Sequence, residues 1–159
     1  MRKLLIVMPL VVALGTAGAI SAQANRGRGA PRAHRSHATK VHVVTVPEAD
    51  RFTPFALTIR AGDVVRWVNN DEDAHTVVSD DAFTTAGNTG TDRLLPVDGT
   101  VELRFTRPGA FVYYCRFHAR LDEFNQPVAP GPDGGIQDAN GNFGTPMSGL
   151  ITVLPRNDD

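Results

Sequence analysis

Four side chains that carry sulfur or ring nitrogen stand where strand-like segments begin or end, and their types suit a transition metal. The single cysteine of the chain, Cys115, is followed three positions later by His118, where a strand pattern runs out. A second histidine, His75, lies upstream, and Met147 opens the last strand-like segment. Two imidazoles, one thiolate and one thioether are the donors that a mononuclear copper electron-transfer centre uses. The residue types therefore indicate a candidate copper site with one-electron chemistry.

The alternation of residues 110–115 predicts where Cys115 points. Phe111, Tyr113 and Cys115 fall on one face of an extended strand, and we expect this aromatic face to be the core side. His118 follows in a loop, and the two intervening residues allow a tight turn that brings its imidazole toward the sulfur. His75 follows an acidic loop and can approach from a neighbouring strand end. We therefore expect these three donors to converge at one end of the domain.

The elements that must position these donors are short strands separated by turns rich in glycine, proline and aspartate. Strand-like patterns cover residues 41–46, 55–59, 64–68, 75–78, 101–105, 110–115 and 150–154. No stretch carries a convincing helical period. Repeated short strands with this punctuation favour an all-β fold, namely an antiparallel Greek-key β-sandwich or barrel.

Residues 1–24 have the features of a secretory signal peptide. Arg2 and Lys3 precede an apolar stretch, and Ala22-Gln23-Ala24 fits an A-x-A cleavage site. The apolar stretch is interrupted by Pro9 and is too short for a retained membrane anchor. We expect an exported protein, periplasmic or extracellular, without a transmembrane segment after cleavage. In that oxidising environment, burial or metal binding would protect the lone thiol.

Charge divides the remaining chain, roughly 135 residues, into a basic arm and an acidic domain. All 17 acidic residues follow Lys40, whereas residues 25–40 contain only basic charges. We expect residues 25–40 to be disordered, residues 41–155 to form one domain and residues 156–159 to be a tail. The arm could bind metal loosely through His34 and His37 or touch an anionic partner, but a solvated linker is the favoured interpretation.

Residues 41–154 resemble the cupredoxins, the blue copper family that includes plastocyanin, pseudoazurin and amicyanin. The resemblance rests on residues 57–69 (LTIRAGDVVRWVN), 75–77 (HTV), 108–115 (PGAFVYYC) and 147–153 (MSGLITV). It implies a cupredoxin-type sandwich that binds one copper ion cycling between Cu(I) and Cu(II). It assigns His75, Cys115 and His118 as equatorial ligands and Met147 as the weak axial ligand. It also implies an electron carrier, not an enzyme, that serves redox protein partners through His118 near the surface.

The chain departs from the cupredoxin pattern at two places. Thr76 stands where an asparagine often follows the first histidine ligand and braces the cysteine loop. Residues 119–146 form an insertion between the second histidine and Met147, where the family normally has only a few residues. Because both ends of the insertion adjoin ligands, we expect an irregular cap at the metal end rather than a silent loop. Its expected apolar packed side chains are Leu121, Phe124, Val128 and Phe143, and its expected solvent-facing ones are Asp122, Glu123 and Asp138.

Two other functions fit similar donors. A copper storage, delivery or resistance module would exchange its metal readily, and the histidine-bearing arm is compatible with that role. A small red-copper-like enzyme would open a coordination position, with Glu123 of the insertion as a candidate oxygen ligand. A thiol hydrolase is disfavoured because Cys115 and His118 have no identifiable third orienting residue. We expect a monomer and no nucleic-acid partner.

Overall fold

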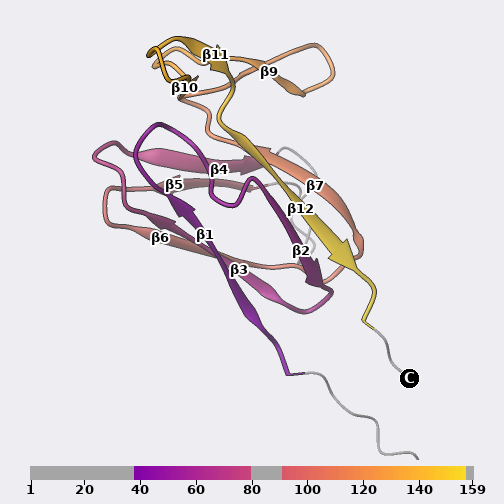
Figure 1. The fold of residues 1–159 in the computed structure, drawn as a ribbon. Helices are drawn as coiled ribbons and strands as arrows, with labels where there is room; N and C mark the ends of the chain where they lie inside the picture. The colour runs from indigo at the N-terminus through magenta and orange to yellow at the C-terminus, as the bar shows by residue number, and fades with distance from the viewer. Residues whose placement is uncertain (1–37, 80–90, 157–159) are drawn as a thin grey trace, which may run out of the picture. The chain divides into compact units, whose positions relative to one another are not determined.

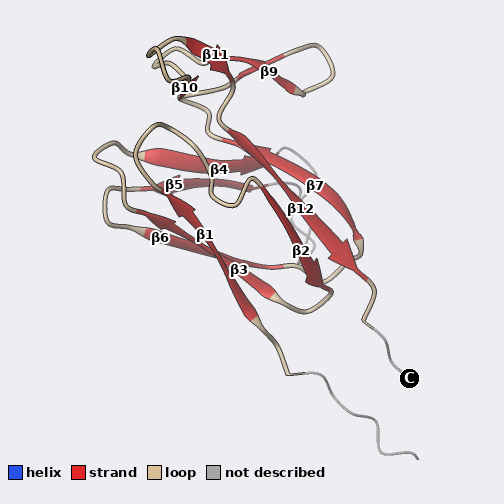
Figure 2. Cartoon of the chain, viewed as in Figure 1, coloured by secondary structure: helices blue, strands red, loops and turns tan. Residues whose placement is uncertain are grey.

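The structure, a computed structural model, describes residues 38–79 and 91–156, and within these ranges it contains strands and no helix (Figures 1 and 2). This confirms the all-β prediction. In chain order the strands are β1 (Val41–Val46), β2 (Ala56–Arg60), β3 (Val64–Asn69), β4 (His75–Ser79), β5 (Thr91–Leu95), β6 (Thr100–Arg104), β7 (Gly109–Tyr114), β8 (Arg120–Leu121), β9 (Pro127–Ala129), β10 (Ile136–Gln137), β11 (Phe143–Thr145) and β12 (Ser148–Leu154).

Two sheets form the sandwich. One has the order β1-β3-β6 and the other the order β2-β12-β7-β4-β5. Most neighbouring strands pair antiparallel, as expected, but β1 pairs with β3 in parallel and β12 pairs with β2 in parallel. Parallel partners need a crossover between the sheets rather than a hairpin. The β-sandwich is therefore confirmed, while purely antiparallel pairing is not.

The core between the sheets is built from the inward faces of alternating strands. Trp67 of β3 and Tyr113 of β7 are both fully buried, and their rings meet edge to face with centroids 5.4 Å apart. Phe52, which lies in the β1–β2 connection, packs against the same tyrosine with ring centroids 4.7 Å apart. Gly149 on β12 lies opposite Tyr113, and a Cβ there would stand 2.5 Å from the tyrosine hydroxyl oxygen. The aromatic face of β7 is thus the core face, as its alternation predicted.

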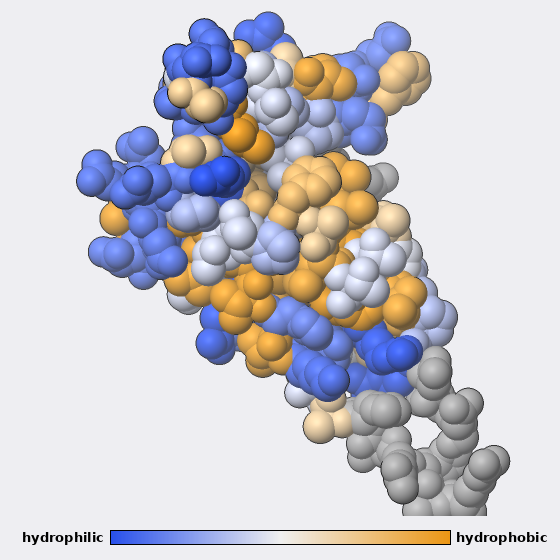
Figure 3. Space-filling view, viewed as in Figure 1, coloured by the Kyte–Doolittle hydropathy of each residue, from blue (hydrophilic) through white to orange (hydrophobic). Residues whose placement is uncertain are grey.

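The insertion, residues 119–146, consists of two small hairpins, β8–β9 and β10–β11, joined by irregular segments. Leu121 packs against a small cluster outside the main core, as expected. Phe124, Val128 and Phe143 are 72%, 55% and 48% exposed, so the prediction that they pack is wrong. Hydrophilic side chains cover much of the insertion on the face shown in Figure 3, and apolar ones gather over the sandwich below. Ile136 of β10 packs against the main core, and backbone hydrogen bonds such as that from the Asp133 amide to the Phe117 carbonyl also hold the insertion.

The expected signal peptide, most of the basic arm and most of the tail lie outside the described residues. Within the ranges that are described, no helix is long and apolar enough to cross a membrane.

Candidate metal centre

The ligand loop begins where β7 ends. The amide of His118 donates to the carbonyl of Cys115 at 3.1 Å, which closes a tight turn over residues 115–118. The carbonyl of Met147 accepts a hydrogen bond from the amide of Cys115 at 3.0 Å, and the amide of Met147 donates to the carbonyl of His118 at 2.9 Å. These bonds hold all three residues together, as the turn prediction required, despite the insertion between His118 and Met147.

The nitrogen and sulfur donors converge on one point. His75 Nδ1 lies 3.2 Å from His118 Nδ1, and Cys115 Sγ lies 3.4 Å from His118 Nδ1. Two donors bound at about 2.0–2.3 Å to one transition-metal ion are separated by roughly 3–4 Å, so this spacing fits a shared ion. His75 and Cys115 are fully buried and His118 is 4% exposed. Two imidazoles and a thiolate in a dry setting suit copper.

Met147 is fully buried in the same core cluster as Cys115. Its backbone bonds on either side place it at the metal end, so the insertion has not displaced it from the ligand loop. The structure therefore brings the thioether residue beside the other donors, and its role as the axial ligand stays a prediction.

Thr76 connects the cysteine to β4. Its amide donates to Cys115 Sγ at 3.3 Å and its hydroxyl lies 3.7 Å from the same sulfur. The hydroxyl oxygen also accepts the amide of Arg116 at 2.9 Å, which ties β4 to the ligand turn. Thr76 thus braces the cysteine loop in the place where the family often has asparagine.

The environment of Cys115 favours the thiolate. Burial alone would raise its pKa, but hydrogen bonds with His118, His75 and Thr76 outweigh burial and lower the pKa to about 6. The thiolate is the form that binds a metal. The lowered pKa therefore favours the sulfur anion at neutral pH.

Two carboxylates stand behind the histidines. Asp71 Oδ2 lies 3.3 Å from His75 Nε2, and Asp50 Oδ1 lies 3.4 Å from His118 Nε2. Neither aspartate is recognisable from the sequence, because an aspartate in a polar loop carries no periodic signal. The only hint was the acidic loop that precedes His75.

Burial and neighbouring charges together shift the pKa of His118 and of Asp50. Burial lowers the pKa of His118, but Cys115 and then Asp50 and Asp133 raise it, and the net shift is upward. Burial raises the pKa of Asp50, and the nearby imidazoles of His118 and His75 offset only part of that rise. The outer side of the site is thus a partly buried cluster of coupled groups.

The insertion is fastened to the ligand loop. The amide of Asp133 donates to the carbonyl of Phe117 at 3.0 Å. Gly131 passes so close that an added Cβ would collide with the carbonyl oxygen of Phe117 and stand 2.6 Å from the amide nitrogen of Ala119. A hollow of about 270 Å³ between the insertion and the β3–β4 loop is lined by Asp73, Ala74, Phe117, His118 and Asp133. The insertion thus contacts the ligand turn at the metal end and His118 borders the hollow, while its role as a cap stays a prediction.

Glu123, the candidate oxygen ligand of an open site, is exposed. Among the described residues, the donors that lie within 4.8 Å of one another form the groups His75, Cys115, His118 and Asp50, Asp71, His75. Glu123 belongs to neither group, so the structure does not bring it to the metal centre.

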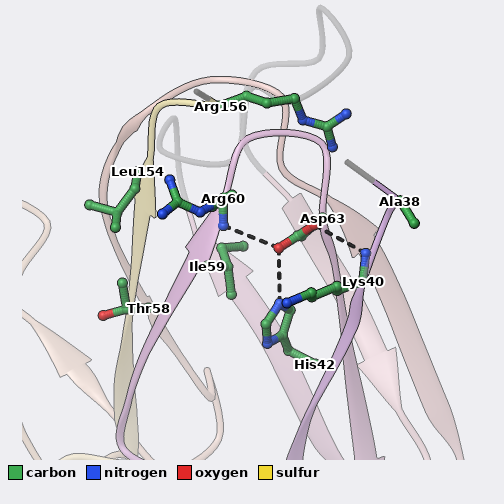
Figure 4. Close-up of a pocket in the computed structure, with 9 residues that line it drawn as sticks. All are labelled: Ala38, Lys40, His42, Thr58, Ile59, Arg60, Asp63, Leu154 and Arg156. Carbon is green, nitrogen blue, oxygen red and sulfur yellow. Dashed lines mark hydrogen bonds and ion pairs between the residues drawn. The ribbon is translucent and has the colours of Figure 1, made fainter. Parts of the chain in front are cut away.

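A second cavity, of about 250 Å³, lies at the far end of β12 and is shown in Figure 4. Lys40, Arg60 and Arg156 line it, but the guanidinium groups of Arg60 and Arg156 point in opposite directions. Asp63 binds His42 Nε2 at 3.0 Å and the amides of Lys40 and Arg60 at 3.1 and 3.2 Å. This end is a structural junction between strands, and its cations do not converge on a ligand. His42 belongs to this junction and not to the metal centre.

This chain is similar to known copper proteins. A family model described as copper binding proteins, plastocyanin/azurin family, matches residues 40–122. Among solved structures, an oxidised amicyanin variant matches at 18% identity over 70% of this chain and 80% of that chain, with a TM-score of 0.46. A reduced amicyanin variant matches at 18% identity over 75% of this chain and 87% of that chain, with a TM-score of 0.47. Amicyanin from Paracoccus versutus matches at 18% identity over 70% and 79%, with a TM-score of 0.45.

Proposed function

This chain belongs to the plastocyanin/azurin family of copper-binding proteins, and on that premise we propose that it is an exported carrier of single electrons. His75, Cys115 and His118 would hold one copper ion, with Met147 as a weak axial donor. When bound, copper supplies a one-electron couple between Cu(I) and Cu(II). The observation that carries the proposal is the convergence of three buried donors: His75 Nδ1 and Cys115 Sγ lie 3.2 and 3.4 Å from His118 Nδ1.

Rigidity supports electron transfer rather than substrate chemistry. Hydrogen bonds to the backbone of Met147, and from Thr76 to Cys115 Sγ, hold the donor residues in place. Donors that are already in place need little rearrangement when the charge of the site changes. The hollow beside the site is lined by His118 but by none of the other three donor residues, so it offers a substrate no route to them.

The same hollow suggests where a redox partner approaches. His118 is the donor residue on its lining and is 4% exposed, whereas His75, Cys115 and Met147 are fully buried. We infer that a partner protein docks over this hollow and exchanges electrons through His118, with the Cys115 backbone as a second covalent route into β7. Export follows from the basic and apolar character of residues 1–24.

The test is spectroscopic and electrochemical. The protein beginning at residue 25, loaded with one equivalent of Cu(II), is expected to show an intense thiolate-to-copper charge-transfer band and a reversible one-electron wave. Cys115→Ser and His75→Gln should abolish the band, and His42→Gln, which changes a histidine outside the site, should retain it. Failure of the parent protein to bind copper, or a band that survives Cys115→Ser, contradicts the proposal.

Two further measurements separate the rival functions. A storage or delivery module would surrender its copper to a chelator within the time of mixing, whereas a buried carrier should release it slowly. A copper enzyme with an open coordination position would change its spectrum on addition of azide, whereas the carrier should not respond.

A further inference from the structure

Asp50 and Asp71 meet the two histidines from the side away from Cys115. Each imidazole turns its Nδ1 inward, toward the other ring and the sulfur, and its Nε2 outward, toward one carboxylate. An ionised carboxylate only accepts hydrogen bonds, so the imidazole nitrogen that faces it must carry the proton. The inner nitrogen then keeps its lone pair for a metal.

Asp71 is held rigidly in the β3–β4 loop. Its amide donates to Asn69 Oδ1 at 3.0 Å, and its second carboxylate oxygen accepts the amide of Glu72 at 2.7 Å. Asn69 is fully buried, and its side-chain amide donates to the carbonyls of Asp73, Leu95 and Pro96. One oxygen of Asp71 is thereby fixed by the backbone, which leaves Oδ2 aimed at His75.

Asp50 lies in a loop whose backbone has an uncommon conformation. Ala49 and Asp50 both have positive φ, 75° and 48°, although neither is glycine. Non-glycine residues with positive φ persist only where the surrounding structure imposes that conformation. Thr45 and Thr53 close the base of this loop with two hydrogen bonds of 2.8 Å, and Phe52 anchors it in the core. The strained turn ends with the Asp50 carboxylate against His118.

We propose that Asp50 and Asp71 are positioning residues of the metal centre, each holding one histidine ring by its Nε2 so that both Nδ1 atoms stay free and converge on Cys115. This inference rests on the proposed copper function. A carboxylate behind a ligating histidine also makes the imidazole a stronger donor, which favours copper binding. The two aspartates come from different loops, but their carboxylates lie within 4.8 Å of each other and of a His75 nitrogen, so they form one acidic cluster behind the two rings.

The first test uses the metal-free protein and therefore does not depend on copper binding. Nitrogen-15 NMR of the histidine rings, at a pH where both are neutral, is expected to show His75 and His118 protonated at Nε2. Asp50→Gly, which keeps the positive φ without a side chain, should mix the tautomers of His118, and Asp71→Ala should mix those of His75. Asp50→Asn and Asp71→Asn keep an acceptor oxygen and should largely restore the parent tautomers. Glu72→Gln, an exposed change in the same loop, is the control.

The second test measures Cu(II) affinity by chelator competition for the same variants, with circular dichroism as a check that each is folded. Loss of either carboxylate should weaken binding by about 10–100-fold, and the control should stay within roughly 2-fold. Parent tautomers and parent affinity in folded Asp50→Gly and Asp71→Ala would overturn the proposal. A second tightly bound cation that is lost in Asp50→Asn would also overturn it, because the carboxylates would then be ligands themselves. A parent protein that binds no copper but shows the expected tautomers would remove the proposed function and leave the positioning role standing.

Discussion

Replacing Gly131 with alanine tests whether the insertion holds the ligand loop in place. The added Cβ would collide with the carbonyl oxygen of Phe117 and stand 2.6 Å from the amide nitrogen of Ala119, both of them backbone atoms that no side-chain rotation can move away. Overpacking of this kind costs about 1–3 kcal/mol. The hairpin can escape the clash only by giving up the hydrogen bond from the Asp133 amide to Phe117, which contributes about 1 kcal/mol.

We therefore expect Gly131→Ala to lower the free energy of unfolding by about 1–3 kcal/mol, which corresponds to a fall in Tm of roughly 4–12 °C for a domain of this size. Gly144→Ala is the matched control, because no atom lies within 4 Å of a Cβ at that position of the insertion. The assay is thermal unfolding by near-ultraviolet circular dichroism, combined with hydrogen exchange of the Asp133 amide. Equal Tm values and equal Asp133 exchange in the two variants would refute the reasoning.

Met147→Leu should keep the fold and the copper but raise the reduction potential by on the order of 60 mV, because loss of a weak donor disfavours Cu(II); an unchanged potential and spectrum by voltammetry and absorption would assign the axial position to another residue. Thr76→Val removes a hydroxyl that lies 3.7 Å from Cys115 Sγ and that accepts the Arg116 amide. The reduction potential should therefore fall, and the free energy of unfolding should decrease by about 1–2 kcal/mol. Thr76→Ser keeps the hydroxyl and should keep both parent values. Asp63→Asn should lower the free energy of unfolding by about 1–3 kcal/mol at neutral pH. Burial raises the pKa of Asp63, but its hydrogen bonds bring the net pKa below the usual range, so its contribution is complete above the unfolded pKa near 4 and is lost as the pH falls through the folded pKa. Parent and variant stabilities should accordingly converge in acid, and a constant difference in urea unfolding across that range would contradict this account.

The convergence of the candidate donors was predictable from sequence because each residue sits at a strand end whose pattern is clear. Alternation placed Cys115 on the core face, and the short spacing to His118 predicted the turn that the Cys115 carbonyl closes. The order of elements then brought His75 and Met147 to the same end of the sandwich. Local patterns sufficed for these residues because the site is assembled from adjacent strand ends.

Other features depend on information that local patterns lack. Alternation along a strand predicts which face is buried, but it does not predict which strand lies beside it, so the parallel pairing of β1 with β3 could not be predicted. Strand β5 was missed because Thr91, Asp92 and Arg93 open it with polar residues. Asp50 reaches His118 only through positive φ at two successive residues, and nothing in their side chains predicts that conformation. Phe124 and Phe143 are exposed, whereas Leu121 and Ile136 of the same small hairpins pack against apolar clusters, and the local sequence does not distinguish the two pairs.

The neck of the insertion is the point where its two ends meet, and Met147 is hydrogen-bonded there to the backbones of His118 and Cys115. Residues far apart in sequence are therefore adjacent in space. His118 and Met147 are bonded backbone to backbone at 2.9 Å, although the whole insertion lies between them in sequence. Doubling the length of a closed loop costs only about 0.6 kcal/mol in chain entropy. The neck therefore makes residues 119–146 an exchangeable module: a designer could graft a different recognition loop above the ligand loop while the strand ends continue to set the donor spacing.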